Sequence, residues 1–265
     1  MVKLIWIVHM QLKVLTLNIM HGRNTTNSIF PMHTNTATTL RNMTRIIDVL
    51  KREDADIVFL QEIDEHSTIS GNVDQIQMIA DETQYEHYTH GKHTEIHLNN
   101  VYSFASGTSI FCKYPLTNAM NHKFLPSFPT PRKGFVVADM ILPDDHKITL
   151  ASVHFVWLDY LHFQSKTKQA QKVIDVISER ANPIILGGDF NIDLQEKGGV
   201  LSYFEEQLKL HTTTKTGEGT FTHSAQDPTL QIDWIFTSRD MQFSEYRVLD
   251  DRVSDHLAVT AIMDF

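Results

Sequence analysis

Polar residues suited to metal binding and proton transfer border strand-like apolar runs in the last third of this sequence. Asp189 and Asn191 follow the run IILGG, Asp233 lies within QIDWIF, and Asp255 and His256 open the final run, DHLAV. An unpaired carboxylate inside a protein core is costly, so these acids are better suited to a site at the ends of strands. Carboxylates and a histidine that converge there indicate a hard divalent metal with a proton-transfer group beside it.

Three further polar residues end apolar runs nearer the N-terminus. Asn18 ends VLTLN, Glu62 ends IVFLQE and His154 ends LASVH. Each has an ordinary alternative when taken singly: Asn18 as a structural amide, Glu62 as a helix cap and His154 as a hydrogen-bonded core histidine. Asp189 and Asn191 have one too, because aspartate and asparagine often occupy turns.

The elements that must position these residues alternate between strand and helix patterns. Runs rich in Val, Ile, Phe and Thr predict strands at 13–19, 56–62, 107–113, 135–142, 148–155, 183–186, 231–237, 246–249 and 257–263. Apolar residues at helical spacing fall within 40–50, 73–80, 170–177 and 201–208. Polar, proline-rich or weakly periodic stretches predict long loops at 22–35, 83–106 and 125–131.

This pattern predicts an α/β fold, a four-layer sandwich of two packed mixed β-sheets flanked by helices. A doubly wound sheet would need more crossover helices than the periodicity provides. No loop resembles a linker between domains, so we expect residues 1–265 to form a single domain. Residues 1–11 contain a short apolar run interrupted by His9. We do not expect them to be a signal peptide; a leader outside the core is the alternative, with Met10 as an alternative start to Met1.

The composition of the chain indicates which binding partners and which cell compartment are favoured. The chain of 265 residues carries 23 Lys and Arg against 32 Asp and Glu, a formal net charge of −9. This balance disfavours strong nonspecific affinity for polyanions without excluding a nuclease. Cys112 is the single cysteine, so no intrachain disulfide forms and a cytoplasmic location is favoured over secretion. No run approaches the roughly 18 apolar residues of a membrane span.

The motifs GGDFN and SDH, with Asn18, Glu62 and His154 before them in order, resemble the endonuclease/exonuclease/phosphatase superfamily. That superfamily includes deoxyribonucleases, abasic-site endonucleases, neutral sphingomyelinases and inositol polyphosphate 5-phosphatases. The resemblance runs from Lys13 to Met263 and implies a four-layer α/β sandwich. Because the motifs occur together and in the family order, a shared site is favoured over separate structural roles.

The resemblance implies a metal site and a catalytic set. Glu62 resembles the principal ligand of Mg²⁺, with Mn²⁺ as the alternative ion, and Asn18 lies beside it. Asp255 resembles a further acidic ligand. Asp189 and Asn191 resemble the residues that orient the water and the scissile phosphate.

The histidines complete the set implied by the resemblance. His256 resembles the histidine on which hydrolysis depends, held by Asp233, and His154 resembles a second histidine that contacts the phosphate. The sequence leaves open whether Asp189 or His256 accepts the proton from water, and whether one metal binds or two.

The predicted function is therefore Mg²⁺-dependent hydrolysis of a phosphoester, with a phosphodiester favoured. The alternatives are a nuclease acting on DNA or RNA, a sphingomyelinase-like phospholipid phosphodiesterase, an enzyme for small soluble phosphoesters, and an inactive binding protein on the same fold. Phe155, Trp157 and Phe163 near His154 would suit a lipid head group. Either Arg132 or Lys133 is a candidate to approach a phosphate, and a solvated hairpin end is the alternative.

Overall fold

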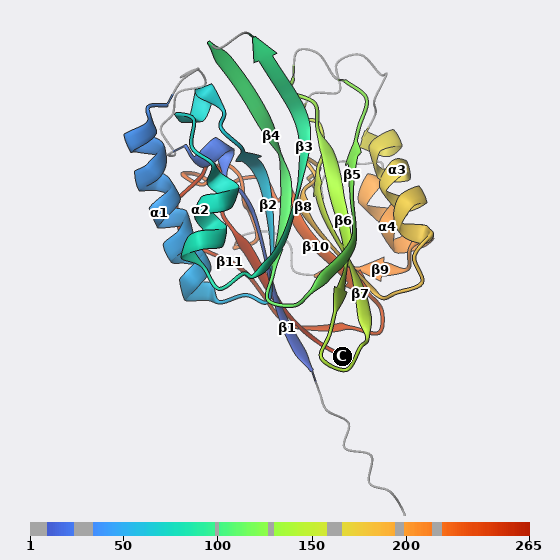
Figure 1. Ribbon diagram of the computed structural model, residues 1–265. Helices are drawn as coiled ribbons and strands as arrows, with labels where there is room; N and C mark the ends of the chain where they lie inside the picture. Colours follow the sequence, from blue (N-terminus) through green and yellow to red (C-terminus); the bar gives the residue numbers. More distant parts are fainter. Residues whose placement is uncertain are drawn as a thin grey trace, which may run out of the picture.

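Two six-stranded sheets pack face to face in the computed structural model, and a pair of helices covers each outer face (Figure 1). The structure describes residues 10–23, 34–98, 101–126, 130–157, 166–193, 199–213 and 219–265. In the figure α1 and α2 lie at the left, the sheets in the middle, and α3 and α4 at the right. The predicted α/β sandwich of two mixed sheets with flanking helices is confirmed. The alternative leader, apart from its last residues, lies outside the described residues.

The first sheet has the strand order β11-β12-β1-β2-β4-β3. Its strands are β1 (Gln11–Asn18), β2 (Ile57–Asp64), β3 (His87–Leu98), β4 (Tyr102–Cys112), β11 (Gln242–Val248) and β12 (Val259–Asp264). Strands β1 and β2 are parallel, and the other neighbours are antiparallel. The parallel pair makes Asn18 and Glu62 emerge at the same edge of the sheet.

The second sheet has the order β5-β6-β7-β8-β10-β9. Its strands are β5 (Leu116–Lys123), β6 (Gly134–Ile141), β7 (Lys147–His154), β8 (Ile184–Asp189), β9 (Leu210–His211) and β10 (Asp233–Ser238). Strands β7 and β8 are parallel and the other neighbours are antiparallel. His154 and Asp189 therefore also emerge side by side.

Alternate residues of the central strands face different layers, so both faces of each sheet are buried. In β1, Leu12 and Val14 pack between the two sheets, whereas Leu15 and Leu17 pack beneath α1 and α2. This is why central strands appear in the sequence as nearly continuous apolar runs. A third cluster, which includes Phe155 and Phe190, lies between the second sheet and α3 and α4.

The four predicted helices are present. They are α1 (Thr36–Glu53), α2 (Gln75–Glu82), α3 (Lys166–Ser178) and α4 (Val200–Gln207), with short 3₁₀ helices at Met20–Gly22 and Thr68–Ser70. Side chains of Asn35 and Asp74 accept hydrogen bonds from the first turns of α1 and α2, as N-caps do. Among the described residues no helix is both long and apolar enough to cross a bilayer.

The prediction of a long loop at 83–106 is wrong. Most of this stretch forms β3 and the first half of β4, paired over eleven positions. β3 is the edge strand of its sheet, and its last four residues are exposed. An edge strand buries little and needs no apolar alternation, so periodicity did not reveal it. β5, an edge strand of the other sheet and also largely exposed, escaped the prediction for the same reason.

Candidate active site

The predicted residues gather where the ends of the two sheets meet. In the second sheet His154 on β7 pairs in register with Asp189 on β8, and Asp189 pairs with Asp233 on β10. From the first sheet, Asn18 donates a hydrogen bond from Nδ2 to Oδ2 of Asp189 at 3.0 Å. Strands far apart in the sequence thus bring four of the predicted residues together.

Asp189 is the centre of this arrangement. Besides Asn18, Nε2 of His154 lies 3.3 Å and Nε2 of His256 lies 3.8 Å from its Oδ2. Burial alone would raise the pKa of the Asp189 carboxyl. The positive charge of His256 and the interaction with His154 outweigh burial and hold this pKa well below its usual range. Asp189 is therefore a carboxylate at neutral pH.

His256 and Asp233 form a buried pair beside it. Nδ1 of His256 lies 2.8 Å from Oδ2 of Asp233. Burial lowers the pKa of His256, but the charges of Asp233 and Asp189 raise it well above the usual value. Burial also raises the pKa of Asp233, which the His256 charge opposes. His256 is accordingly an imidazolium near neutral pH, with Nε2–H directed toward Asp189.

Glu62 projects into the site from a bulge in β2. The register with β4 shifts between Gln61 and Ile63, and Glu62 itself has a left-handed backbone with φ 52°. A bulge re-aims a side chain in this way. It directs Oε1 of Glu62 to within 3.9 Å of Nε2 of His154.

Two cations surround the Glu62 carboxylate. Nζ of Lys133 donates to Oε1 at 2.7 Å, and Nε2 of His21 lies 3.3 Å from Oε2. Nδ1 of His21 is held in turn by the buried Asp64 at 2.8 Å. Burial raises the pKa of Glu62, but the interactions with Lys133, His21 and His154 bring it well below the usual value. Of the two basic candidates on this hairpin, Lys133 is the one that donates a hydrogen bond to Glu62.

The glycines of GGDFN allow β8 to reach this position. Gly188 has φ 145°, and a Cβ there would lie 2.0 Å from the carbonyl oxygen of Val153. A Cβ at Gly187 would lie 2.6 Å from the ring of Phe59. Only glycine fits such a close approach. The motif thus brings β8 close enough to β7 for Asp189 to meet His154.

Asn191 and Asp255 occupy the rim of the site. The backbone N–H of Asn191 donates to Oδ1 of Asp189 at 2.9 Å, and its side chain donates to the carbonyl of Phe155 at 3.0 Å. Asn191 thus makes the hydrogen bonds of a turn residue, which is the alternative role that the sequence allows for it. Asp255 is partly exposed and accepts a hydrogen bond from the hydroxyl of Ser254 at 3.1 Å.

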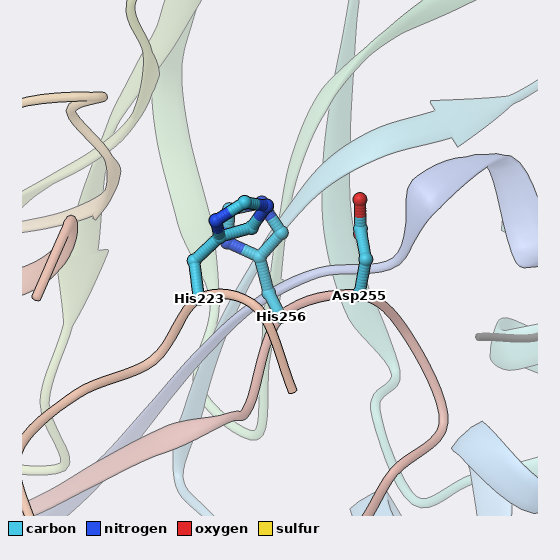
Figure 2. Close-up of side chains that lie close together, drawn as sticks. All are labelled: His223, Asp255 and His256. Carbon is cyan, nitrogen blue, oxygen red and sulfur yellow. The ribbon is translucent and has the colours of Figure 1, made fainter. Parts of the chain in front are cut away.

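Asp255 lies close to two histidines. Among the described residues, two sets of three side chains have ligand atoms within 4.8 Å of one another: His223 with Asp255 and His256, and Asp189 with Asp233 and His256. Glu62 belongs to neither set. Figure 2 shows the side chains of His223, Asp255 and His256 rising on the same side of their backbones.

The sequence pattern does not place two residues of this region, His21 and His223, in the site, and it predicts Lys133 only as a phosphate contact. His21 follows the end of β1 by three residues, so its closeness to Asn18 in the sequence is an available signal. His223 follows no predicted strand, and a β-bridge to His256 brings it to the site, which sequence periodicity does not reveal.

The donor chemistry at Glu62 fits a hard divalent cation. Glu62 is ionised, and Asn18 offers an amide oxygen that accepts one hydrogen bond, from Met20 N at 3.0 Å, and retains a second lone pair. Mg²⁺ takes such oxygen ligands, usually from one or two carboxylates with several waters. The ammonium of Lys133 already shows that positive charge is stabilised beside this carboxylate.

Known proteins resemble this chain in sequence and in fold. Residues 15–256 match the model of the Endonuclease/Exonuclease/phosphatase family. A search among curated proteins finds no match. Among solved structures, an endonuclease/exonuclease/phosphatase from Beutenbergia cavernae has a TM-score of 0.76 at 19% identity, over 96% of this chain and 71% of that one.

Two other solved structures show the same likeness of fold. The catalytic domain of human nocturnin, solved with a bound sulfate, has a TM-score of 0.68 at 17% identity, covering 96% of this chain and 93% of its own. The beta toxin of Staphylococcus aureus has a TM-score of 0.65 at 16% identity, covering 94% and 99%.

Proposed function

The chain belongs to the endonuclease/exonuclease/phosphatase family, and from this premise we propose that it is a Mg²⁺-dependent hydrolase that cleaves a phosphodiester. Members of this family are metal-dependent phosphoesterases. The observation that carries the proposal is the buried carboxylate of Asp189, contacted by Asn18, His154 and His256 from three separate strand ends. A structural acid would need one such partner, whereas a phosphoester site needs several charged groups that face one reacting centre.

The metal would be held by Glu62, with Asn18 beside it and Asp255 as a further acidic ligand. When bound, Mg²⁺ supplies Lewis-acid stabilisation of the charge on the phosphoryl oxygens. Mn²⁺ takes similar oxygen ligands and is the alternative ion.

The side chains of the chain supply the remaining chemistry. Asp189, ionised and fixed by Asn18, orients the attacking water, and Asn191 holds the turn that places it. His256, positively charged, donates from Nε2 toward the phosphoryl group, and Asp233 fixes its ring. His154, whose pKa is lowered first by burial and then by Lys133, lies between Glu62 and Asp189 and contacts the phosphate as a neutral side chain. General acid–base assistance by a positioned side chain typically contributes about 10²–10⁴-fold to a rate.

The surroundings of the site bear on the substrate. His21, Arg132 and Lys133 line a pocket together with Glu62 and His154, which suits an anionic group next to the scissile bond. Trp157, 67% exposed after the end of β7, supports a lipid or a nucleobase as a neighbouring part of the substrate. Phe155 is fully buried and forms no part of a lipid rim, and Phe163 lies outside the described residues. A nuclease and a sphingomyelinase-like enzyme thus remain the two finer alternatives.

Hydrolysis of bis-p-nitrophenyl phosphate tests the proposal. The wild-type protein should release nitrophenol with Mg²⁺ and lose this activity with EDTA, and Asp189→Ala and His256→Ala should each be at least about 100-fold slower. Equal rates in all three proteins would contradict the proposal and favour a binding protein that has lost catalysis. A panel of DNA, RNA, sphingomyelin and phosphoinositides, each with Mg²⁺ and with EDTA, identifies the substrate class.

A further inference from the structure

His223, Asp255 and His256 form a compact group at the edge of the site, which we call the rim cluster. One ring nitrogen of each histidine and one carboxylate oxygen of Asp255 lie within 4.8 Å of one another. The two rings have centroids 4.9 Å apart. The three side chains rise from two neighbouring segments to the same side (Figure 2).

The backbone holds the rim cluster in place. The N–H of Ala225 donates to the carbonyl of Asp255 at 2.7 Å, and the N–H of Leu257 donates to the carbonyl of Thr222 at 2.8 Å. These two bonds tie the segment around His223 to the segment that carries Asp255 and His256. The cluster is therefore built by the fold and does not depend on a chance approach of flexible side chains.

Asp233 gives His256 the orientation of a metal ligand. It accepts a hydrogen bond from Nδ1 of His256 at 2.8 Å and is fully buried. A histidine that binds a metal almost always donates its other ring N–H to a carboxylate, a carbonyl or water. With Nδ1 engaged in this way, Nε2 of His256 is the nitrogen that an ion can take, and binding of the ion releases the proton of Nε2 to solvent.

We propose that the rim cluster is a binding site for a borderline transition-metal ion, with Zn²⁺ as the best match. Two imidazoles and one carboxylate suit Zn²⁺, which commonly takes three protein ligands and a water in a tetrahedral site. A hard ion such as Mg²⁺ has little preference for imidazole. Tetrahedral zinc requires ligand distances of about 2.0–2.2 Å, so each side chain must move inward by less than about 1 Å.

Zn²⁺ in the rim cluster inhibits hydrolysis. It occupies Nε2 of His256 and withdraws Asp255 from the Mg²⁺ ligands. This inhibitory part rests on the proposed function, whereas binding of Zn²⁺ does not. The cluster thus gives the protein an inhibitory metal site that shares Asp255 with the proposed oxygen-rich site at Glu62.

Isothermal titration of metal-free protein with Zn²⁺ tests the binding. The wild type should bind one ion at the cluster with Mg²⁺ present in excess, and His223→Gln should bind it at least about tenfold more weakly, because loss of even an outer partner of a ligand costs 10–100-fold. His66→Gln is the matched control, since His66 is 64% exposed and lies 3.4 Å from a single acid, Asp74. This control should bind Zn²⁺ as the wild type does.

Three results would overturn the proposal: no stoichiometric Zn²⁺ binding, equal affinity in wild type and His223→Gln, or a loss confined to Glu62→Gln, which would put zinc in the oxygen site. Circular dichroism verifies that His223→Gln folds, and Asp255→Asn replaces it if it does not, with the same weakening expected. Absorption of Co²⁺-loaded wild type in the visible range should show tetrahedral nitrogen and oxygen coordination. Inhibition of each protein is measured relative to its own rate without Zn²⁺. The Zn²⁺ concentration that halves the rate should be at least about tenfold higher for His223→Gln than for the wild type. An unchanged concentration would contradict the inhibitory role.

Discussion

Asp233 lies directly opposite Asp189 in the antiparallel register of β8 and β10, so the fold places two buried carboxylates side by side. The ring of His256 bridges them, with Nδ1 2.8 Å from Asp233 and Nε2 3.8 Å from Asp189. Neighbouring buried carboxylates disfavour each other's ionisation. The positive charge of His256 therefore stabilises the folded site.

His256→Gln should lower the free energy of unfolding of the metal-free protein by about 3–5 kcal/mol, because it leaves buried carboxylates without their cation. The pKa of His256 is raised in the folded state, so its contribution is fully present below the ordinary value of 6.5 and is lost as pH rises through the raised pKa. Urea unfolding in EDTA at pH 6 and at pH 9.5 measures the loss of unfolding free energy and its dependence on pH. Adding Asp233→Asn should restore part of the loss, and a cost below about 1 kcal/mol at pH 6 would refute the charge argument.

The pH dependence of hydrolysis should reflect the positive charge of His256. Because His256 keeps its proton through neutral pH, the rate constant should stay level near pH 7 and fall on the alkaline side, as the imidazolium is lost. Asp233→Asn removes a charge that raises the pKa of His256, so its alkaline limb should move to lower pH. Initial rates from pH 5 to 10 test this. A rate that rises steadily from pH 7 to pH 10 would contradict a protonated His256.

Gly188→Ala should lower the free energy of unfolding by about 3 kcal/mol or more. The new Cβ would collide with the carbonyl of Val153, in a backbone conformation that only glycine adopts freely. Gly219→Ala is the control, because Gly219 has φ 88° but nothing within 4 Å of its Cβ position. It should cost about 1 kcal/mol. Urea midpoints compare the two, and equal costs would show that contact with β7 is not what requires glycine at 188.

Lys133→Met should strengthen the binding of Mn²⁺, used in place of Mg²⁺, by about tenfold or more. Lys133 lies 2.7 Å from Oε1 of Glu62, and its charge repels a second cation at the same carboxylate. Electron paramagnetic resonance of free Mn²⁺ gives the affinity. Lys113→Met, which removes an ion pair with Asp54 and Asp56 outside the site, should leave it unchanged. Weaker binding in Lys133→Met would mean that Glu62 is not the main ligand.

The sequence predicts the parts of this protein that are buried on regular elements. Strands such as β1 and β8 are apolar on both faces, and their terminal polar residues, Asn18 and Asp189, stand out against them. The exposed strand β3 has no such contrast and was predicted to be a loop. The prediction of a single domain stays a prediction.

Site residues outside strand ends depend on tertiary contacts. His223 reaches His256 through a β-bridge, and Lys133 reaches Glu62 across the interface of the two sheets. Neither contact follows from periodicity, because it depends on how the layers pack. The grouping of Asp255 with His223 and His256 is likewise a property of the folded chain.

The turnover of bis-p-nitrophenyl phosphate by Asp189→Asn, compared with Asp139→Asn, tests the central claim most directly. Both aspartates are buried in the second sheet, but Asp139 pairs with Arg180 at 2.7 Å away from the site. With Mg²⁺ saturating and both variants folded, kcat should fall at least about 100-fold in Asp189→Asn and stay within about threefold of wild type in Asp139→Asn. Equal kcat values in the two variants would contradict a phosphodiesterase site built around Asp189.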